Sequence, residues 1–340
     1  MAEIGARAAQ GQSPAPETLR RVEEIASKAP LAPEPFLIKG ALAQVQQQQE
    51  QAERLFVAAR TRDPRSVAAR YFLAERYLRT GRIALALGEI AALSRLFPEA
   101  RAQFGPALAA FSSMPGSQPQ LRSFFRSSPE MEPLVLLSLA EDARSAELIM
   151  ALWGGRRPGA GEPRPEWEAK LLSRLVEAGQ FTKAHAIWRQ VAGVNPDGAS
   201  VFNRGFREVP APPPFNWRFA SAGAVVEPAA GDRLQVIYYG REDIVLAEQL
   251  LVLPPGRYQL AMAISGPLGE GSDIAWTLTC VPRTEPVFRL PVDRTGQIGG
   301  NFAVPERCPA QRLQLVGSAG EFSQSREFTV GRFSLMRAGA

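Results

Sequence analysis

Histidine and cysteine are scarce in this 340-residue sequence, which contains one histidine, His185, and two cysteines, Cys280 and Cys308. A single histidine rules out metal sites that are built from several imidazoles. A Ser-His-Asp or Cys-His arrangement would have to use His185, which lies beside Ala184 in a helical pattern and is better read as a packing residue. The sequence also lacks G-x-S-x-G, P-loop and H-E-x-x-H motifs. We therefore predict a protein that is not an enzyme and that holds no metal or cofactor.

Lysine is nearly absent, since it occurs only at Lys28, Lys39, Lys170 and Lys183, and the other basic residues are arginine. The net charge of +5 is spread along the chain, and residues 199–340 carry 14 Arg against 13 Asp and Glu. No dense basic stripe is present. The sequence therefore disfavours nucleic-acid binding by phosphate neutralisation.

Long apolar runs are missing too. No run reaches the roughly 18 residues that a membrane-spanning helix needs, so we expect no transmembrane segment in this chain. The N-terminal stretch MAEIGARAAQGQSPAPETLRR has no apolar core of a signal peptide. Two alternatives follow: the protein is cytoplasmic, or a leader or anchor has been removed from an extracytoplasmic protein.

A repeat of 34 residues organises the first part of the chain. Three windows align without gaps, at residues 33–66, 67–100 and 165–198. The second and third windows share apolar or small residues at eight offsets. These are Leu73, Ala74, Tyr77, Gly81, Ile83, Ala86, Ile90 and Leu93, and then Leu171, Leu172, Leu175, Gly179, Phe181, Ala184, Trp188 and Val191. Their spacing predicts a helix, a glycine turn and a second helix that ends before a proline.

The first window departs from this pattern, because Gln47 stands at the turn position and Lys39 replaces an apolar residue. Ala52, Phe56 and Ala59 keep the register. Between the second and third windows, we expect shorter helices that include Leu134–Leu139 and Ala146–Trp153, with a break near Glu141, followed by a loop at 154–165.

The windows resemble the tetratricopeptide repeat (TPR). That resemblance implies an α-solenoid over residues 17–198, after a flexible N-terminus at 1–16. The first helices of such repeats line a concave surface that suits a protein or peptide partner. The predicted groove residues are Tyr71, Glu75, Leu78, Arg79, Glu166, Ser173 and Glu177.

From about residue 199, alternation with a period of two replaces helical spacing. Strands are predicted at 234–239, 247–253, 258–264, 274–280, 311–316 and 328–336, with turns at 254–256, 266–273 and 296–301. Many short strands at this spacing predict an antiparallel β-sandwich over residues 199–340. The fold class is thus multidomain α plus β.

Cys280 ends one predicted strand and Cys308 precedes another. We predict a disulfide between them, which on loop entropy would stabilise the domain by roughly 3–4 kcal/mol and would indicate an oxidising compartment. The alternative is two unrelated buried thiols in a cytosolic protein. On the disulfide we predict a periplasmic or otherwise extracytoplasmic location.

The segment VFNRGFREVPAPPPFNWRF (201–219) resembles the start of jelly-roll carbohydrate-binding modules of the family 4/9 type. Asn203, Gly205, Phe206 and Trp217 match that start, and Arg204 is inserted in the motif. The resemblance covers roughly residues 201–337. It implies a jelly roll and, by analogy of fold, polysaccharide binding.

Sugar binding needs exposed aromatic faces beside polar side chains. Trp276 shares a strand face with Leu278 and Cys280, so we expect it in the core, and the same parity places Tyr238 there. The opposite face carries Tyr239 and Gln235. With Trp217, which lies in a polar, proline-rich segment, these form the predicted ligand-binding set.

Carboxylates are also present in the sandwich. Glu270 and Asp273 could hold calcium, but two carboxylates make a solvated turn the simpler interpretation. Spacing nominates no catalytic pair among Asp232, Glu242, Asp243 and Glu248.

Taken as a whole, the chain resembles extracytoplasmic bacterial TPR proteins that carry a helical repeat array before a sandwich, and that resemblance implies a non-catalytic, envelope-associated scaffold or adaptor. Its solenoid would bind a protein partner, and its sandwich would bind a glycan or pack on the solenoid. One alternative is a jelly-roll glycan-processing enzyme with a helical appendage. Another is a purely structural assembly protein.

Overall fold

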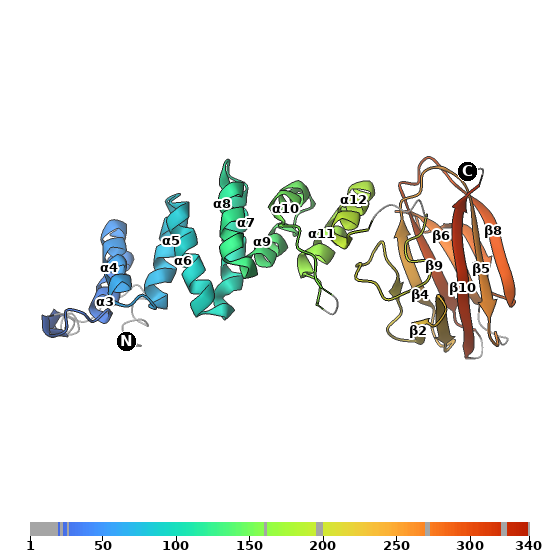
Figure 1. Cartoon of the computed structure of the whole chain (residues 1–340), viewed down its shortest axis with the longest axis horizontal. Helices are drawn as coiled ribbons and strands as arrows, with labels where there is room; N and C mark the ends of the chain where they lie inside the picture. Colours follow the sequence, from blue (N-terminus) through green and yellow to red (C-terminus); the bar gives the residue numbers. More distant parts are fainter. Residues whose placement is uncertain are drawn as a thin grey trace. The chain divides into compact units, whose positions relative to one another are not determined.

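The computed structural model describes residues 20, 23–25, 27–159, 162–194, 200–268, 273–320 and 325–338. Helices end at Ala192 and strands begin at Arg218, so the predicted fold class, a helical part followed by an antiparallel β-sandwich, is confirmed (Figure 1). The predicted flexible segment 1–16 lies outside the described residues.

Contacts divide the chain into two compact units. The first contains Met1–Leu139 and Ser145–Gly154, and the second contains Ala140–Arg144 and Gly155–Ala340. The last helix pair therefore belongs to the same compact unit as the sandwich. The predicted domain boundary at 198/199 falls inside that second unit, between the last helix and the first strand.

The first unit is built from helices joined by short turns (Figure 1). They are α3 (Glu34–Val45), α4 (Gln49–Arg62), α5 (Val67–Arg79), α6 (Ile83–Leu96), α7 (Arg101–Ser112), α8 (Ser117–Ser127), α9 (Glu132–Leu139) and α10 (Ala146–Leu152). The two short helices expected around residues 134–139 and 146–153 are confirmed as α9 and α10. Phe56 of α4 stacks on Phe72 of α5 at 4.1 Å between ring centroids, which joins the first helix pair to the second.

The turn inside each aligned helix pair has the same backbone conformation. Gln47, Gly81 and Gly179 all have positive φ, at 60°, 71° and 70°. The N–H of each following residue donates to a carbonyl five positions earlier, as from Arg82 to Tyr77 at 2.9 Å. This is the Schellman arrangement, in which a left-handed residue ends a helix. The glycines at the turn are thus confirmed as left-handed caps, and Gln47 takes the same conformation without being glycine.

The second unit contains α11 (Glu166–Glu177) and α12 (Phe181–Ala192) and two five-stranded sheets. One sheet, called here sheet A, has the order β1-β4-β9-β6-β7, and the other, sheet B, has the order β2-β3-β10-β5-β8. Their strands are β1 (Arg218–Phe219), β2 (Ala224–Ala229), β3 (Arg233–Tyr238), β4 (Ile244–Leu251), β5 (Gly256–Ser265), β6 (Asp273–Val281), β7 (Pro286–Pro291), β8 (Gly296–Val304), β9 (Ala310–Ser318) and β10 (Arg326–Arg337). All described ladders are antiparallel, and the six predicted strands are confirmed as β3, β4, β5, β6, β9 and β10.

The inner faces of the two sheets form one apolar core. Trp276 and Tyr238 are fully buried in it, as their parity predicted. The rings of Trp276, Trp217, Phe206 and Phe333 contact one another at centroid distances of 5.1–5.8 Å. This aromatic cluster joins both sheets to the segment that precedes β1.

The prediction of a turn at 296–301 is wrong, because these residues belong to β8. Glycine is needed at Gly299 and Gly300 because there is no room for a side chain. A Cβ on Gly299 would lie 2.8 Å from the Leu260 carbonyl oxygen, and one on Gly300 would lie 2.9 Å from the Phe288 ring. The glycines that suggested a turn are instead places where a neighbouring residue comes very close to the strand.

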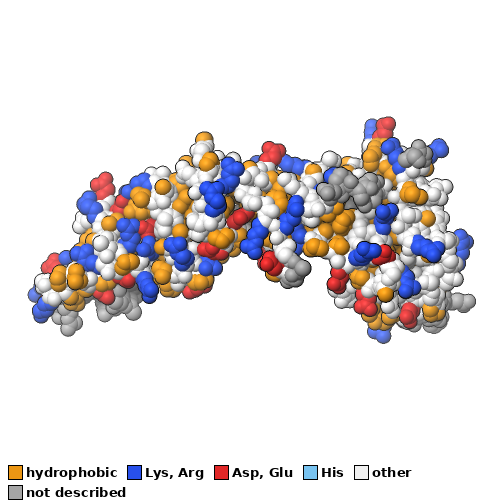
Figure 2. Space-filling model, in the orientation of Figure 1, with side chains coloured by type: hydrophobic (Ala, Val, Ile, Leu, Met, Phe, Trp, Pro, Cys, Tyr) orange, Lys and Arg blue, Asp and Glu red, His pale blue; other side chains and the backbone are white. Residues whose placement is uncertain are grey.

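The predicted disulfide is confirmed between Cys280 and Cys308, whose Cα atoms lie 5.2 Å apart. It ties the end of β6 to the segment before β9. Within the described ranges, no helix is both long enough and apolar enough to cross a membrane. On the face drawn in Figure 2, basic and acidic side chains are interspersed.

Replacing Gln47 by glycine should stabilise the first helix pair. A left-handed conformation costs an ordinary residue roughly 1–2 kcal/mol, and glycine loses part of that advantage through about 0.4–1 kcal/mol of extra unfolded-state entropy. We expect Gln47→Gly to raise the opening free energy of α3 and α4 by a net of roughly 0.5–1 kcal/mol. Hydrogen exchange in these two helices should slow accordingly. The converse variant is Gly81→Ala. Its Cβ would meet no atom within 4 Å, so the substitution tests the backbone conformation alone. It should speed exchange in α5 and α6. Equal exchange rates in the wild type and both variants would show that the turn conformation does not limit the stability of these helix pairs.

Candidate functional site

The segment between the last helix and the first strand is held by α12. We call residues 200–217 the lead-in segment. The buried indole of Trp188 donates its N–H to the carbonyl oxygen of Pro212 at 2.7 Å. Its ring also contacts Phe202 edge-on at 5.0 Å and Phe215 at 5.7 Å. A helix residue of the third repeat thus fixes the lead-in segment at two aromatic contacts and one hydrogen bond.

Arg164 is a second tie between the helix pair and the lead-in segment. Its guanidinium bonds Glu168 of α11 at 2.5–2.6 Å, the Val191 carbonyl at the end of α12 at 3.2 Å, and the Pro210 carbonyl. Burial raises the pKa of Glu168 despite the nearby guanidinium. One side chain therefore connects both helices with the lead-in segment.

The first part of the lead-in segment is a tight loop organised by Asn203. Its side-chain oxygen accepts the Arg207 N–H at 2.9 Å, and its amide nitrogen donates to the Arg207 carbonyl at 2.7 Å and to Asn216 at 3.2 Å. The carbonyl of Asn203 accepts the indole N–H of Trp217 at 3.0 Å. Asparagine suits this place because it tolerates the left-handed backbone, here with φ 53°. The loop is thereby fastened onto the aromatic core.

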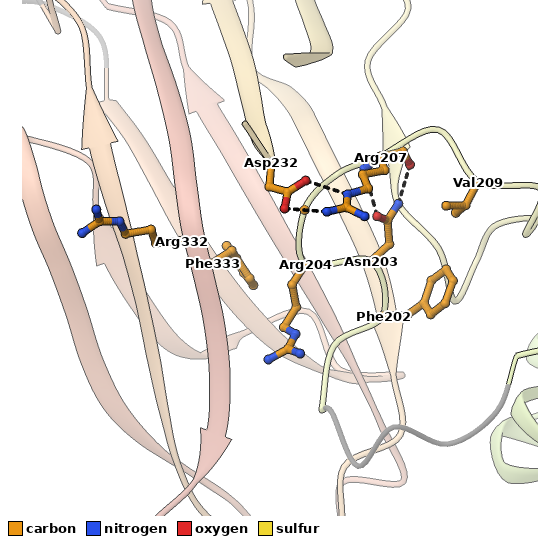
Figure 3. Close-up of a pocket in the computed structure, with 9 residues that line it drawn as sticks. Phe202, Asn203, Arg204, Arg207, Val209, Asp232, Arg332 and Phe333 are labelled. Carbon is orange, nitrogen blue, oxygen red and sulfur yellow. Dashed lines mark hydrogen bonds and ion pairs between the residues drawn. The ribbon is translucent and has the colours of Figure 1, made fainter. Parts of the chain in front are cut away.

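The loop meets the turn before β3 through an ion pair. The Arg207 guanidinium bonds both carboxylate oxygens of Asp232, at 2.6 and 2.8 Å (Figure 3). The hydrogen bonds from Arg207 lower the pKa of Asp232, so the carboxylate stays ionised. Gly205 lets the two segments approach, since a Cβ there would lie 2.9 Å from the Asp232 carboxyl carbon.

A bulge in β10 forms a second wall of the site. The pairing of β10 with β5 shifts between Gly331 and Ser334, and Arg332 has φ 49°. The extra residue turns Arg332 to solvent while Phe333 keeps its place in the core. Bulges of this kind re-aim side chains next to functional sites.

These segments enclose an open cavity of about 470 Å³, which we call the lead-in pocket (Figure 3). Its lining residues are Phe202, Asn203, Arg204, Gly205, Arg207, Val209, Asp232, Arg332 and Phe333. The volume lies within the range of small-ligand sites. Arginine donors, the ionised carboxylate of Asp232 and an apolar floor allow it to hydrogen-bond a polar ligand. Among its described lining residues, Asp232 is the one carboxylate.

Backbone strain gathers at this pocket. Among the described residues, five other than glycine have positive φ, and Asn203, Asp232 and Arg332 all line the cavity. Phe206, with φ 54°, lies in the same loop. Such conformations cost of order 1–3 kcal/mol at ordinary residues such as Arg332 and Phe206, are better tolerated by Asn and Asp, and cluster at binding and catalytic sites. Within the described residues, positive φ at residues other than glycine is therefore concentrated at and beside the lead-in pocket.

A second cavity, of about 450 Å³, lies between α11 and the outer face of sheet A. Its lining residues are Ala169, Ser173, Val176, Pro213, Pro214, Arg218, Glu248, Leu250 and Arg312. Its carboxylate, Glu248, is paired with Arg218 and accepts a hydrogen bond from Gln314 at 2.9 Å. This cavity brings Ser173, one of the predicted groove residues, together with the sandwich.

The predicted ligand-binding residues lie apart from one another. Trp217 is 5% exposed in the aromatic core, so its ring offers no free face, and it supports the lead-in pocket from below through Asn203. Tyr239 is 39% exposed just after β3, with Arg241 over its ring at 6.0 Å. Gln235 is half-buried on β3. None of the three lines either cavity.

The predicted groove residues belong to both compact units. On α5, Tyr71 is 42% exposed and its ring lies 5.7 Å from that of Phe104, while Glu75 pairs with Arg79 at 3.5 Å. Leu78 is half-buried.

On α11, Ser173 donates to Glu177 at 2.9 Å, and Glu166 is exposed in the first turn. The α5 residues thus belong to the first unit, and the α11 residues belong to the second.

Sequence reasoning missed most of the lead-in pocket. Arg207 and Asp232 are 25 positions apart, and no local pattern links them. Arg332 could have been found, because Val330 and Phe333 are three positions apart in a strand whose other core residues alternate. That break, beside a glycine, is the pattern of a bulge.

His185 packs at the helix pair, against aromatic rings of the described residues. Its ring lies 4.9 Å from Phe215 and 5.7 Å from Trp188. Within the part of the chain that the structure describes, no group of three or more His, Cys, Asp or Glu residues could hold a metal ion. Glu270, named above with Asp273, lies outside that part.

No protein-family model matches the sequence, and no curated protein matches it. Three solved structures are similar at low scores. The module TmCBM61 in complex with β-1,4-galactotriose is 17% identical, covers 41% of this chain and 98% of its own, and has a TM-score of 0.29. A CBM4 structure is 14% identical over 41% of this chain and 99% of its own, with a TM-score of 0.32. Accessory secretory protein 1, 2 and 3 from Streptococcus pneumoniae is 15% identical over 35% and 88%, with a TM-score of 0.26. Similarity at this level identifies no ligand for the chain.

The stability of the second unit should depend on pH through His185. Burial and then the charge of Arg189 lower the pKa of His185, so the folded protein binds the proton less readily than the unfolded chain, whose imidazole titrates near 6.5. Stabilisation is complete above about pH 6.5 and is lost as the pH falls from there toward the folded-state pKa. We expect the urea midpoint to fall more between pH 7.5 and 5.5 for the wild type than for His185→Gln. Parallel curves for the two proteins would show that His185 does not titrate differently on folding.

Proposed function

We propose that the protein is a non-catalytic adaptor whose sandwich binds a glycan in the lead-in pocket and whose helical part binds a protein partner. The observation that carries this proposal is the lead-in pocket itself. It joins three strained backbone positions, a bidentate Arg207–Asp232 pair and exposed guanidinium donors around one cavity.

Glycan binding suits this chemistry. Sugar hydroxyls both donate and accept hydrogen bonds, and an ionised carboxylate beside a guanidinium offers each kind of partner in a fixed geometry. The Asp232 side chain is 52% exposed, and that of Arg207 is 69% exposed, so both can still reach a ligand. Phe202 and Phe333 give the cavity an apolar part against which the carbon skeleton of a sugar ring can pack.

A binding role is favoured over glycan hydrolysis. Hydrolysis by the common route needs two carboxyl groups roughly 5–9.5 Å apart, one of which is protonated. Among the described lining residues, Asp232 is the sole carboxylate of the lead-in pocket and Glu248 is the sole one of the second cavity. Arg207 lowers the pKa of Asp232, which opposes its use as a proton donor at neutral pH.

The helical part would act as a TPR-like solenoid that holds a protein or peptide. Support comes from the repeated Schellman turns at the aligned positions and from the exposed face of α5 that carries Tyr71, Glu75 and Arg79. An extracytoplasmic location, in the periplasm of a bacterium, would suit the Cys280–Cys308 bond, because disulfides persist in oxidising compartments.

Binding of the full chain to a panel of immobilised glycans tests the pocket. We expect a bound glycan whose affinity falls roughly 10- to 100-fold in Asp232→Asn, which loses charge-assisted hydrogen bonds of about 1.5–3 kcal/mol. Asparagine keeps the left-handed backbone that Asp232 adopts, and its amide oxygen can still accept a hydrogen bond from Arg207.

The matched control is Asp293→Asn, an exposed aspartate outside both cavities. It should leave the affinity unchanged. If the panel yields no bound glycan, the adaptor loses its carbohydrate half and the purely structural alternative is favoured. Equal losses in the two variants would place the glycan elsewhere.

A further inference from the structure

The charge on the lead-in pocket is unbalanced. Three arginines are among its lining residues, Arg204, Arg207 and Arg332, against one acidic residue, Asp232. The Asp232 carboxylate is already paired with Arg207. Arg204 and Arg332 have no hydrogen-bond or ion-pair partner among the residues that the structure describes. Within the described part of the chain, Arg204 and Arg332 thus place two positive charges at the pocket without an acidic partner.

The two free guanidinium groups come from different elements. Arg204 belongs to the loop held by Asn203, and Arg332 lies in the bulge of β10. In Figure 3 both side chains extend away from the Arg207–Asp232 pair, with Phe333 drawn between Arg332 and that pair. Neither is directed at Asp232, so neither can exchange into its ion pair without a change of rotamer.

The backbone at both arginines is held in a defined, non-extended conformation. Asn203 just before Arg204 is left-handed, and Arg332 itself is left-handed at φ 49°. A regular strand would place residue 332 with the opposite parity and would keep an arginine out of the pocket wall. Strain that displays a charged side chain is a cost in stability, and it indicates a ligand for that side chain.

The second cavity has a smaller excess of positive charge. Its Arg218 is paired with Glu248, which leaves Arg312 as the one cation there without a partner in the described structure. Positive φ at residues other than glycine does not occur among its lining residues. Of the two cavities, the lead-in pocket is therefore the one whose charge favours an anionic ligand.

We infer that the lead-in pocket takes an acidic glycan, whose carboxylate or sulfate groups are bound by Arg204 and Arg332 while Asp232 accepts hydrogen bonds from its hydroxyl groups. Guanidinium matches the planar, two-oxygen geometry of a carboxylate and equally bonds sulfate oxygens. This inference rests on the proposed glycan binding and narrows it to one chemical class. A neutral glycan would leave both guanidinium groups without a partner at the bound ligand.

Pairs of probes with the same backbone test the inference with the full chain. Tetragalacturonate is compared with its methyl ester, and dextran sulfate with dextran, so that each pair differs in charge. We expect the acidic member of at least one pair to bind ten-fold tighter or more, and which pair does so distinguishes carboxylate from sulfate. Raising the salt concentration should weaken that binding, because exposed charges are screened.

Matched variants separate the pocket from the overall positive charge. Arg204→Gln/Arg332→Gln should lose at least ten-fold in affinity for the acidic probe. Arg283→Gln/Arg294→Gln removes the same charge from exposed arginines outside both cavities and should lose less than two-fold. Equal losses in the two double variants would overturn the inference, since bulk charge alone would then explain binding.

The failure of this inference can be told from the failure of the proposed function. If both members of each pair bind equally and Asp232→Asn weakens them while Arg204→Gln/Arg332→Gln does not, the pocket binds glycans without regard to charge and the inference is wrong. If no glycan on the panel or in these pairs binds, the proposed carbohydrate binding fails with it.

Discussion

The hydrogen bond from the Trp188 indole to the Pro212 carbonyl, with the Arg164 clamp beside it, is the constraint on which the second unit depends. Pro212 lies in a segment rich in proline, which has few backbone N–H groups to fold itself. Such a segment needs partners for its carbonyl groups from outside. The last helix pair provides them, which explains why contacts place α11 and α12 with the sandwich.

Once held at one end, the lead-in segment serves two purposes. Phe206 and Trp217 enter the aromatic core, and Asn203 orders the loop between them. The same loop carries Arg204 and Arg207 to the cavity. Core packing and pocket geometry are thus coupled, because the residues that close the core also set the geometry of the pocket. A ligand there would contact a loop that the helices hold in place.

Periodicity predicted the fold class from the sequence, because burial at every third or fourth position and at every second position are strong local patterns. Trp276 and Tyr238 were placed in the core by parity alone. The candidate site was less accessible to such reasoning. Arg207 and Asp232 meet only through tertiary folding. The polar neighbours of Trp217 in the sequence give no sign of the aromatic cluster that buries its ring. The glycines of β8 were misread because close packing and turn formation favour the same residue.

Hydrogen exchange in Trp188→Phe measures most directly whether the helix pair shapes the pocket. The variant keeps an aromatic ring but leaves the Pro212 carbonyl without its donor, at a cost of about 1–3 kcal/mol. The amides of Phe206 and Arg207, which bond to Asn203, should exchange about ten-fold faster or more, while those of β5 and β10 keep their wild-type rates. Unchanged exchange at Phe206 and Arg207 would contradict the account, because the lead-in segment would then fold on the sandwich alone.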